Sequence, residues 1–465
     1  MCLDEEHPGA EVEIMGQNPG ANELRAERLV EWDFGKSERW ESYPQPAPYL
    51  GKTGYMMERQ FFPLAGLTRE KVNLRNAVRC RLGNRNELPG IDLSMMKAAV
   101  QHCQRTYGPK SREGIRLIIA EGEYALYATT GEDGSHAPGR KISRTISGWR
   151  GWLLPFNPPD LPQQVFSEVW HPSPGQISVL PTYHLAYLFR SPWERPVCQA
   201  DWAKAARILR GTWPEPFPLW NESPPPSWPV ASAFDTEFYE REDATTHLIR
   251  WSMAYRGAQG APRLWCVEAG QWPTPLVPPF ARVYFHNVEA DIHHLLDILQ
   301  VKMGRVQEED TMYMHAVLWP DLDHDLDFCG SVYAKTNRWK HLFLTNPKQY
   351  AAGDALGTYD LAMALEQEFA RDPRSEWVYS TLTRPLIPII RQARRAGVRV
   401  EQDRVQRALD ELDALQRSLK DRARALAGFP INLGSDDQVR HWLYDVEQVQ
   451  INPISGRSRL RGWRP

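Results

Sequence analysis

The sequence predicts an α/β protein that ends in a purely helical segment. Short apolar runs typical of strands alternate with segments of helical periodicity through the first 212 residues. A second apolar run, Val230–Phe234, leads directly into acidic residues, and further strand-like and helical segments follow it. After residue 375 only helical patterns remain.

Length and composition indicate a folded protein with more than one domain. A chain of 465 residues exceeds one ordinary core, and 42% hydrophobic and 11% aromatic residues are typical of globular proteins. The net charge of −3 provides no overall basic field, but residues 376–465 hold 16 Lys and Arg against 11 Asp and Glu. Six cysteines do not form a disulfide framework. Without a long apolar run or a signal peptide, a soluble, cytoplasmic protein is expected.

Composition also predicts the domain boundaries. Seven prolines fall within Trp213–Pro229, and such a run is stiff and extended. We therefore expect an α/β domain at 1–212, a linker at 213–230, a second domain at 231–375 and a helical segment at 376–465.

In the first domain, strands are predicted at Glu11–Met15, Arg116–Ala120 and Ile177–Pro181. The first strand runs into the tight turn Gly16-Gln17-Asn18-Pro19-Gly20, whose backbone amides can face an anion or a base. Because helical segments alternate with these strands, the connecting loops should gather at one edge of the sheet.

Four loop blocks in this domain occur in a characteristic order. They are the turn at Gly16–Gly20, the pair Pro48–Gly54 and Asn73–Arg81, and the segment Thr182–Leu188. In that order they resemble a family 4 uracil-DNA glycosylase over Gly16–Pro192. The resemblance implies extraction of a base from the stack into a pocket.

The resemblance also implies residue roles. Tyr49 would stack on a flipped uracil, Asn76 would read its polar edge, and His184 would stabilise the departing anion, although a lone histidine after a strand can also be structural. Gln17, with Asn18 beside it, stands where the family carries a carboxylate, and Leu185-Ala186 replace the Pro-Ser that follows the family's histidine. We therefore expect binding of uracil-containing DNA with slow excision or none.

The same family carries an iron–sulfur cluster held by four cysteines. Cys80 and Cys103 occupy matching positions, and Cys2 is the available residue at the N-terminus. The [4Fe-4S] ligand set is therefore incomplete: either the true start lies upstream, or the cluster has been lost.

The second domain carries acidic residues in three blocks. Asp235 and Glu237 end an apolar run, Asp291 follows another, and Tyr350 and Asp354 lie four residues apart in a helical pattern. Carboxylates at the end of a strand can hold hard divalent cations through oxygen. If the blocks meet, two Mg²⁺ or Mn²⁺ ions can support phosphodiester cleavage.

This ordered set resembles the DEDDy 3′-5′ exonucleases, as found in the proofreading domain of family A DNA polymerases. The resemblance implies a ribonuclease H-like fold in which Asp235, Glu237 and Asp354 bind metal. Asp291 would be a further ligand, directly or through water, and Tyr350 would orient the attacking water. Two further elements match such domains: Asp310-Thr311-Met312 and Trp339-Lys340.

The last segment is predicted to be a series of helices. The pattern that includes Asp354 runs through Phe369, and Thr383–Ala396 and Gln402–Ala427 follow. Ser435–Gln438 matches a capping box that opens another helix. This segment resembles the start of a family A polymerase thumb, whose arginines contact duplex phosphates. Because no palm follows, polymerase activity is not expected.

The favoured interpretation is a DNA 3′-5′ exonuclease fused to a glycosylase-like domain, similar to the N-terminal portion of a phage-type or prophage-type family A polymerase. Its partners would be DNA 3′ ends and uracil-containing DNA, without a membrane. Two alternatives remain: an RNA exonuclease of the ribonuclease D type, and a non-catalytic DNA-binding or clamp module.

Overall fold

The computed structural model describes residues 2–33, 37–80, 93–107, 112–132, 146–159, 167–223, 225, 229–240, 246–257, 259–270, 281–293 and 307–449. The chain divides into two compact units, Met1–Ile387 and Pro388–Pro465. Residues 224 and 226–228 of the predicted linker lie outside the described residues.

The first unit contains two separate five-stranded sheets. The first sheet has the order β4 (Val72–Asn76), β1 (Val12–Gly16), β5 (Leu117–Glu121), β7 (Ser178–Thr182) and β6 (Leu154–Pro155). Its first four strands are parallel, and β6 pairs antiparallel with β7. Each predicted strand is confirmed with a shift of one residue, and with it the α/β class.

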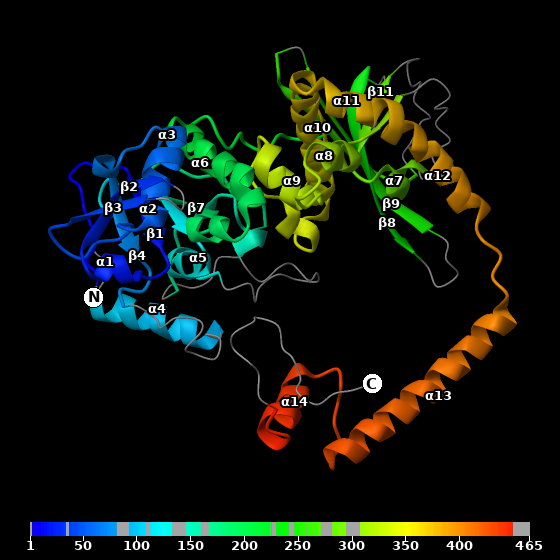
Figure 1. Ribbon diagram of the computed structural model, residues 1–465. Helices are drawn as coiled ribbons and strands as arrows, with labels where there is room; N and C mark the ends of the chain where they lie inside the picture. The colour runs from blue at the N-terminus through cyan, green and yellow to red at the C-terminus, as the bar shows by residue number, and fades with distance from the viewer. Residues whose placement is uncertain are drawn as a thin grey trace. The chain divides into compact units, whose positions relative to one another are not determined.

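Helices cover both faces of the first sheet. α3 (Phe62–Ala65) and α6 (Arg195–Leu209) lie on one side, and α4 (Leu93–Tyr107) and α5 (Glu123–Thr130) lie on the other (Figure 1). Every residue of β1, β5 and β7 is buried, as expected for parallel strands between two helical layers. Their carboxyl ends therefore meet at one edge.

The second sheet mixes antiparallel and parallel strands. Its order is β10 (Pro262–Glu268), β9 (Thr246–Arg256), β8 (Ala231–Glu240), β11 (Arg282–Phe285) and β12 (Gln307–Asp310). The first three strands are antiparallel, whereas β11 runs parallel to both β8 and β12. β11 coincides with the apolar run before Asp291, whereas β8 continues beyond the run Val230–Phe234 to Glu240. Asp235 and Glu237 therefore lie within the strand and not at its end as predicted.

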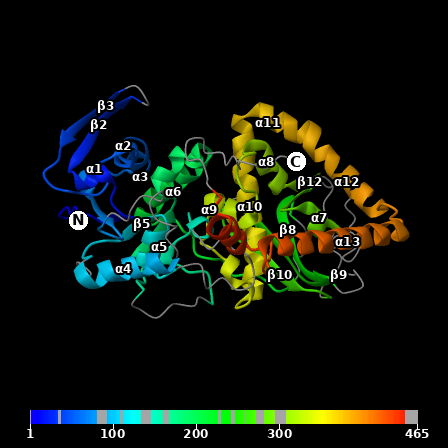
Figure 2. The ribbon, with the colours of Figure 1, turned by 60° about the horizontal axis from the view of Figure 1, so that its bottom comes forward.

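One long helix, α10 (Pro347–Arg371), packs across one face of the second sheet (Figures 1 and 2). The Asn346 side chain caps its start by accepting from the Gln349 amide, and Pro347 occupies its first position. It ends at Arg371, two residues beyond the predicted Phe369, and Asp372 is its C-cap immediately before Pro373.

Four shorter helices surround α10 and the second sheet. They are α7 (Val288–His293), α8 (Thr311–Leu318), α9 (Leu326–Tyr333) and α11 (Pro373–Val378). Beyond residue 375, the Tyr379 hydroxyl donates to Glu309 at 2.8 Å, and Ile387 is buried in the same core as Phe234. These contacts extend the first unit to Ile387.

The second unit is helical. α12 (Arg384–Ala396) leads into it, and α13 (Gln402–Ala427) and α14 (Asp436–Arg440) follow, with α13 spanning the predicted range. The Ser435 side chain caps α14, but the Gln438 side chain accepts from Asn432 N at 2.8 Å. The predicted capping box is therefore only half formed. Among the described helices, none combines the length and apolar character needed to cross a membrane.

Candidate functional site

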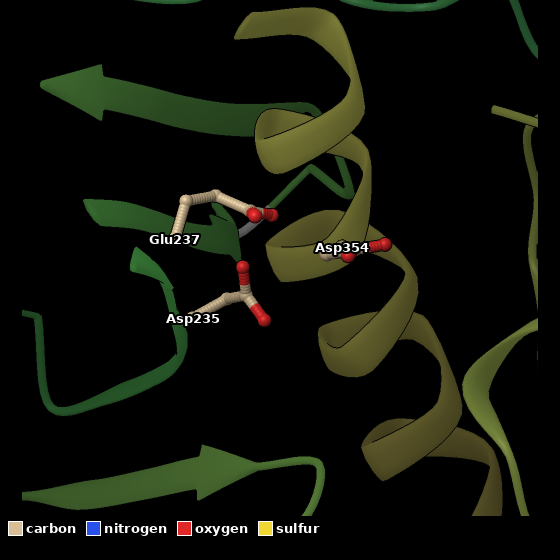
Figure 3. A group of neighbouring side chains, drawn as sticks. All are labelled: Asp235, Glu237 and Asp354. Atoms are coloured by element: carbon tan, nitrogen blue, oxygen red, sulfur yellow. The ribbon is translucent and has the colours of Figure 1, made fainter. Parts of the chain in front are cut away.

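The carboxylates of β8 face α10 because side chains alternate along a strand. Ala233 packs in the core beneath α10, whereas Phe234 packs in the core on the opposite face of the second sheet. Asp235 and Glu237 follow Ala233 at intervals of two and share its face. Carboxylate oxygens of Asp235, Glu237 and Asp354 lie within 4.8 Å of one another, with the strand residues facing the helix that carries Asp354 (Figure 3).

The nearby carboxylates make the charged form of Asp235 unfavourable. Its Oδ2 atom is buried without a hydrogen-bond partner among the described residues. Burial raises the pKa of its carboxyl well above the usual range, and the charges of Asp354, Asp291 and Glu237 raise it further. A bound cation would relieve this repulsion. The donor set is entirely oxygen, so the residues fit a hard divalent ion such as Mg²⁺ or Mn²⁺.

Asp291 lies beside this cluster but is held by β8 itself. Its Oδ1 accepts from the Thr236 amide at 3.0 Å and from the Thr236 hydroxyl at 2.6 Å. Burial raises its pKa to about 8, although the Thr236 hydrogen bonds oppose the shift. Asp291 is outside the group of three, and its role as a further ligand stays a prediction.

Asp310 contacts the start of α7, the helix that carries Asp291. Its side chain caps α8 by accepting from the Met312 and Tyr313 amides, and it also accepts from Val288 N at 2.8 Å. The predicted Asp310-Thr311-Met312 element therefore joins the start of α8 to the start of α7, the helix that carries Asp291.

Asp354 is held by two neighbours that the sequence pattern had paired. The Trp339 indole Nε1 donates to Asp354 Oδ1 at 2.6 Å, and Lys340 Nζ lies 2.5 Å from the same oxygen. Burial lowers the pKa of Lys340, but Asp354 and Tyr350 more than offset it, so the net pKa is raised. Lys340 is therefore a charged ammonium at the edge of the carboxylate cluster.

Two glycines on α10 make room for Trp339. A Cβ on Gly353 would lie 2.4 Å from the Trp339 ring, and one on Gly357 would lie 2.3 Å from it. Glycines at i and i+4 leave a groove on one helix face, and the indole lies in it beside Asp354. Our reading of the sequence missed this pair, although the Gly-x-x-x-Gly spacing inside a helical pattern was a usable signal.

Tyr350 lies one turn before Asp354 on α10. It is buried, and its hydroxyl accepts from Lys340 Nζ at 3.4 Å. Burial and the Asp354 charge raise the pKa of its phenol, so the phenol remains protonated. The structure thus brings Tyr350 and Asp354 onto one helix face with Lys340 between them.

The residues of a second candidate site lie in the loops at the carboxyl edge of the first sheet. Gln17 follows β1, Asn76 ends β4, and His184 lies two residues beyond β7. Tyr49 is buried with φ +59°. A Cβ on Gly16 would lie 2.7 Å from both Asn76 Oδ1 and Tyr49 Oη, so a larger residue there would displace at least one of these side chains.

The side chains at this edge adopt defined positions. The Tyr49 and His184 rings are nearly parallel, with an interplanar angle of 21° and centroids 6.5 Å apart. The Gln17 amide lies against Gly122, where a Cβ would meet it at 2.0 Å. Asn76 Nδ2 donates to Cys2 Sγ at 3.9 Å, and Asn18 Nδ2 reaches its neighbour's carbonyl at 3.5 Å.

His184 is neutral at this edge. Burial, helped by Arg190, lowers its pKa to about 4. Its Nδ1 accepts from the Ala186 amide at 3.2 Å, so the ring proton resides on Nε2. The imidazole can therefore donate one hydrogen bond from Nε2.

Glu121 is a member of this site that we did not predict. It closes β5, is fully buried, and accepts from the Tyr49 hydroxyl at 3.0 Å. Burial raises its pKa to about 8, whereas the Tyr49 hydroxyl and the Leu185 amide oppose the shift. A charged residue closing the apolar run Leu-Ile-Ile-Ala-Glu was the signal in the sequence.

Glu121→Gln should change how stability depends on pH. Because the folded pKa is raised to about 8, the folded state holds a proton that the unfolded state releases above its own lower pKa. The parent should lose stability as pH rises from about 5 to 8, by on the order of 1.4 kcal/mol per unit of pKa shift. The variant keeps the neutral form and should be the more stable protein at pH 8.5. Urea unfolding at pH 5 and 8.5 measures this, and equal differences at both values would contradict it.

The cysteines of the first half of the first unit, residues 1–212, do not fit a four-thiolate cluster. Cys2 is buried, and burial followed by the Glu23 charge raises its thiol pKa to about 12. Cys103 is buried and lines a cavity of about 280 Å³ with Arg79 and Tyr107, whereas Cys80 is exposed. Cys198, the fourth cysteine of this half, is buried in the first core. Burial raises the thiol pKa of both Cys2 and Cys198, so both disfavour the thiolate form that iron requires.

Comparison with known proteins identifies similarity to glycosylases and to a DNA polymerase. Residues 3–207 match the family model of the uracil DNA glycosylase superfamily. The chain is 23% identical over 207 residues to a type-4 uracil-DNA glycosylase from Sulfurisphaera tokodaii, covering 44% of this chain and 72% of that protein. It is 31% identical over 104 residues to a thermostable DNA polymerase I from Thermus thermophilus, covering 22% of this chain and 12% of the polymerase.

Two solved structures align with this chain at low similarity. The polymerase domain of Pol1 from M. smegmatis, in complex with primer-template DNA and dNTP, aligns with a TM-score of 0.36 and 19% identity, covering 49% of this chain and 39% of that one. Brucella melitensis NrnC aligns with a TM-score of 0.28 and 21% identity, covering 35% of this chain and 84% of that one. The chain thus spans much less than two thirds of the polymerases it matches.

Proposed function

We propose that this protein is a metal-dependent 3′-5′ exonuclease that acts on DNA. The observation that carries the proposal is the meeting of Asp235, Glu237 and Asp354, from a strand and a distant helix, within 4.8 Å. A buried carboxylate oxygen without a partner, surrounded by like charges, supports a cation in that position. The polymerase relative and the order of the motifs support DNA as the substrate.

The chemistry follows from the residues around the cluster. When bound, two divalent ions would activate a water molecule and stabilise the leaving oxygen of an in-line displacement. Asp235, Glu237 and Asp354 would hold these ions, and Asp291 would complete the set directly or through water. Trp339 fixes the Asp354 carboxylate. Lys340 holds the Tyr350 hydroxyl, which would orient the attacking water.

A labelled oligonucleotide tests the proposal. A single-stranded DNA labelled at its 5′ end should shorten stepwise from the 3′ end when Mg²⁺ or Mn²⁺ is added, and it should release 5′-mononucleotides. EDTA should stop the reaction. A blocked 3′ terminus that is cut as fast as a free one would indicate an endonuclease instead.

Tyr350→Phe should leave a partial activity. The variant keeps the packing of the ring against Phe343, and it keeps all the acidic residues, so metal binding should be unchanged. Only the hydroxyl that would orient the water is lost, with a decrease of about 10-fold to 10³-fold in kcat and little change in the Mg²⁺ requirement. If the Mg²⁺ requirement rises instead, Tyr350 supports the metal centre and does not orient water.

The matched RNA oligonucleotide separates the alternatives. Faster cleavage of RNA would favour a ribonuclease D type of activity. DNA binding without cleavage of either polymer, under conditions where the protein is folded, would favour a non-catalytic clamp.

We also infer that the first half binds uracil-containing single-stranded DNA. The family match over residues 3–207 supports this function, as does the arrangement of Tyr49, Asn76 and neutral His184 at one sheet edge. Stacking and edge hydrogen bonds can contribute a few kcal/mol to base-specific binding. Excision additionally requires stabilisation of developing charge, and Gln17 is neutral where the family has a carboxylate.

Uracil excision should therefore be slow, with a gain from Gln17→Glu of up to about 10²-fold. The assay uses the full chain with Asp235→Ala, which blocks the nuclease, followed by alkaline scission at abasic sites. Rapid multiple turnover by the parent, without a gain from Gln17→Glu, would show that Gln17 is no handicap. In that case Glu121 would be the carboxylate to examine next.

A further inference from the structure

The segment 334–340, which carries Trp339 and Lys340, is bound by the half of the first unit that contains the first sheet. Asn337 is the main anchor and is buried. Its Oδ1 accepts from Leu153 N at 3.0 Å, and its Nδ2 donates to Leu153 O and Trp170 O, both at 2.9 Å. One side chain thus satisfies three backbone groups that would otherwise be buried without partners.

Further contacts hold the residues around Asn337. The Trp213 indole donates to Ala334 O at 3.1 Å, and Glu215 N donates to Lys335 O at 2.8 Å. Next to Trp339, the Arg338 guanidinium lies 4.5 Å from the Trp149 ring centroid. The first half and the linker therefore hold the segment on both sides of Asn337.

Trp152 contacts Trp339 directly. It is buried, and the two indoles meet edge to face with centroids 5.6 Å apart at 81°. Gly330 lies against both rings, since a Cβ there would be 3.0 Å from Trp339 and 3.2 Å from Trp152. The Trp339 indole is therefore bounded by Trp152 on one side and by the α10 glycines on another.

A buried lysine closes the same interface. Lys204 Nζ donates to Gly151 O at 2.7 Å and to Ser331 O at 2.5 Å. The ammonium also lies 5.6 Å from the Trp152 ring and 4.2 Å from the Trp213 ring. Burial lowers the pKa of Lys204 to about 7. Its two hydrogen bonds tie Gly151, the residue before Trp152, to α9, which precedes the segment.

We propose that the first half of the protein is a positioning element of the nuclease centre, with Trp152 as its principal residue. Trp152 and Asn337 fix Trp339, Trp339 fixes Asp354 through a 2.6 Å hydrogen bond, and Lys340 follows in the same segment. The inference rests on the proposed nuclease function for its consequence in catalysis. The positioning of Trp339 and Asp354 does not depend on whether the protein cleaves DNA.

The test compares Trp152→Phe with Trp202→Phe in the full chain. Trp202 is equally buried but packs on Phe61 and Phe62 within the first core, so its loss reports general destabilisation. Hydrogen exchange of the Trp339 indole proton, assigned by its disappearance in Trp339→Phe, is followed by NMR without metal. Trp152→Phe should speed this exchange at least about tenfold relative to Trp202→Phe, because the indole loses its boundary.

Nuclease kinetics provide the second readout. Trp152→Phe should lower kcat and raise the Mn²⁺ concentration for half-maximal activity, each by about 10-fold, as expected for groups that orient metal ligands. Trp149→Leu, at a half-buried position, should shift both quantities in the same direction and guards against misfolding of the first variant.

The outcomes separate the two ideas. Unchanged indole exchange in both Trp152→Phe and Trp149→Leu would overturn the positioning inference, whatever the nuclease does. Faster exchange in a protein whose parent shows no metal-dependent cleavage would sustain the positioning and refute the proposed nuclease function. Equal effects of Trp152→Phe and Trp202→Phe on indole exchange and on the metal requirement would also overturn the positioning inference.

Discussion

Asp235→Asn is expected to reduce 3′-end cleavage by about 10³-fold or more, the largest effect of any single substitution considered for this protein. The amide keeps the shape of the carboxylate but removes one negative charge from the group that would hold the cations. Charge stabilisation by metal ions contributes several kcal/mol to such reactions, and each 1.36 kcal/mol corresponds to about tenfold in rate. Single-turnover cleavage of a 5′-labelled oligonucleotide at saturating Mg²⁺ measures the loss.

The fold of the variant should be intact. In the metal-free protein, the half-buried Asp235 lies among like charges, so its replacement removes repulsion and should not lower the melting temperature. Mg²⁺ should raise the melting temperature of the parent but hardly that of the variant, because a ligand stabilises only the state that binds it.

Asp445→Asn is the matched control for this experiment. Asp445 also belongs to an Asp-x-Glu sequence, but it is exposed and pairs with His441. Its replacement should change cleavage less than about twofold, in line with the small worth of exposed ion pairs. Cleavage by Asp235→Asn at the rate of Asp445→Asn would show that the carboxylate group is not the catalytic centre.

Gly357→Ala is expected to damage both stability and activity. The added Cβ would lie 2.3 Å from the Trp339 ring, which is fully buried and cannot move outward. Overpacking of this kind typically costs about 1–3 kcal/mol, which exceeds the gain of up to about 1 kcal/mol from replacing glycine inside a helix. Displacement of Trp339 would also loosen Asp354, with a loss of about 10-fold to 100-fold in activity.

The control for Gly357→Ala is Gly20→Ala. No atom lies within 4 Å of a Cβ at Gly20, and its φ of −80° suits any residue, so neither stability nor cleavage should change much. Denaturant unfolding and cleavage rates are measured side by side. An increase in stability for Gly357→Ala with full activity would mean that Trp339 has room to shift and that it does not hold Asp354.

Local patterns in the sequence predicted the secondary structure well. The apolar strands that end at Gly16, Glu121 and Thr182 are each shifted by one residue from their predicted limits. Helix α13 spans Gln402–Ala427 as predicted. Such segments are recognisable because periodic apolar residues and caps lie close together in the chain. The order of the acidic blocks predicted that Asp235, Glu237 and Asp354 would meet, and their carboxylate oxygens lie within 4.8 Å of one another.

Contacts between residues far apart in the chain could not be predicted from such local patterns. The bond from Thr236 to Asp291, the burial of Glu121 beside Tyr49, and the groove of Gly353 and Gly357 for Trp339 join residues 14 to 72 positions apart. The same holds for Tyr379 and Ile387, which carry the first unit beyond the expected boundary at 375. Side-chain packing decides these features.

The sequence by itself therefore determined the α/β class, the order of the elements and the residues capable of metal chemistry, because each depends on periodicity and chemistry within a short stretch. Only the tertiary structure decided which groups support them. It brought Trp152 of the first half against Trp339 of the second and buried Asn337 between Leu153 and Trp170. The physical reason is that the free energy of such contacts depends on burial and on satisfied polar groups, which exist only once distant segments have packed together.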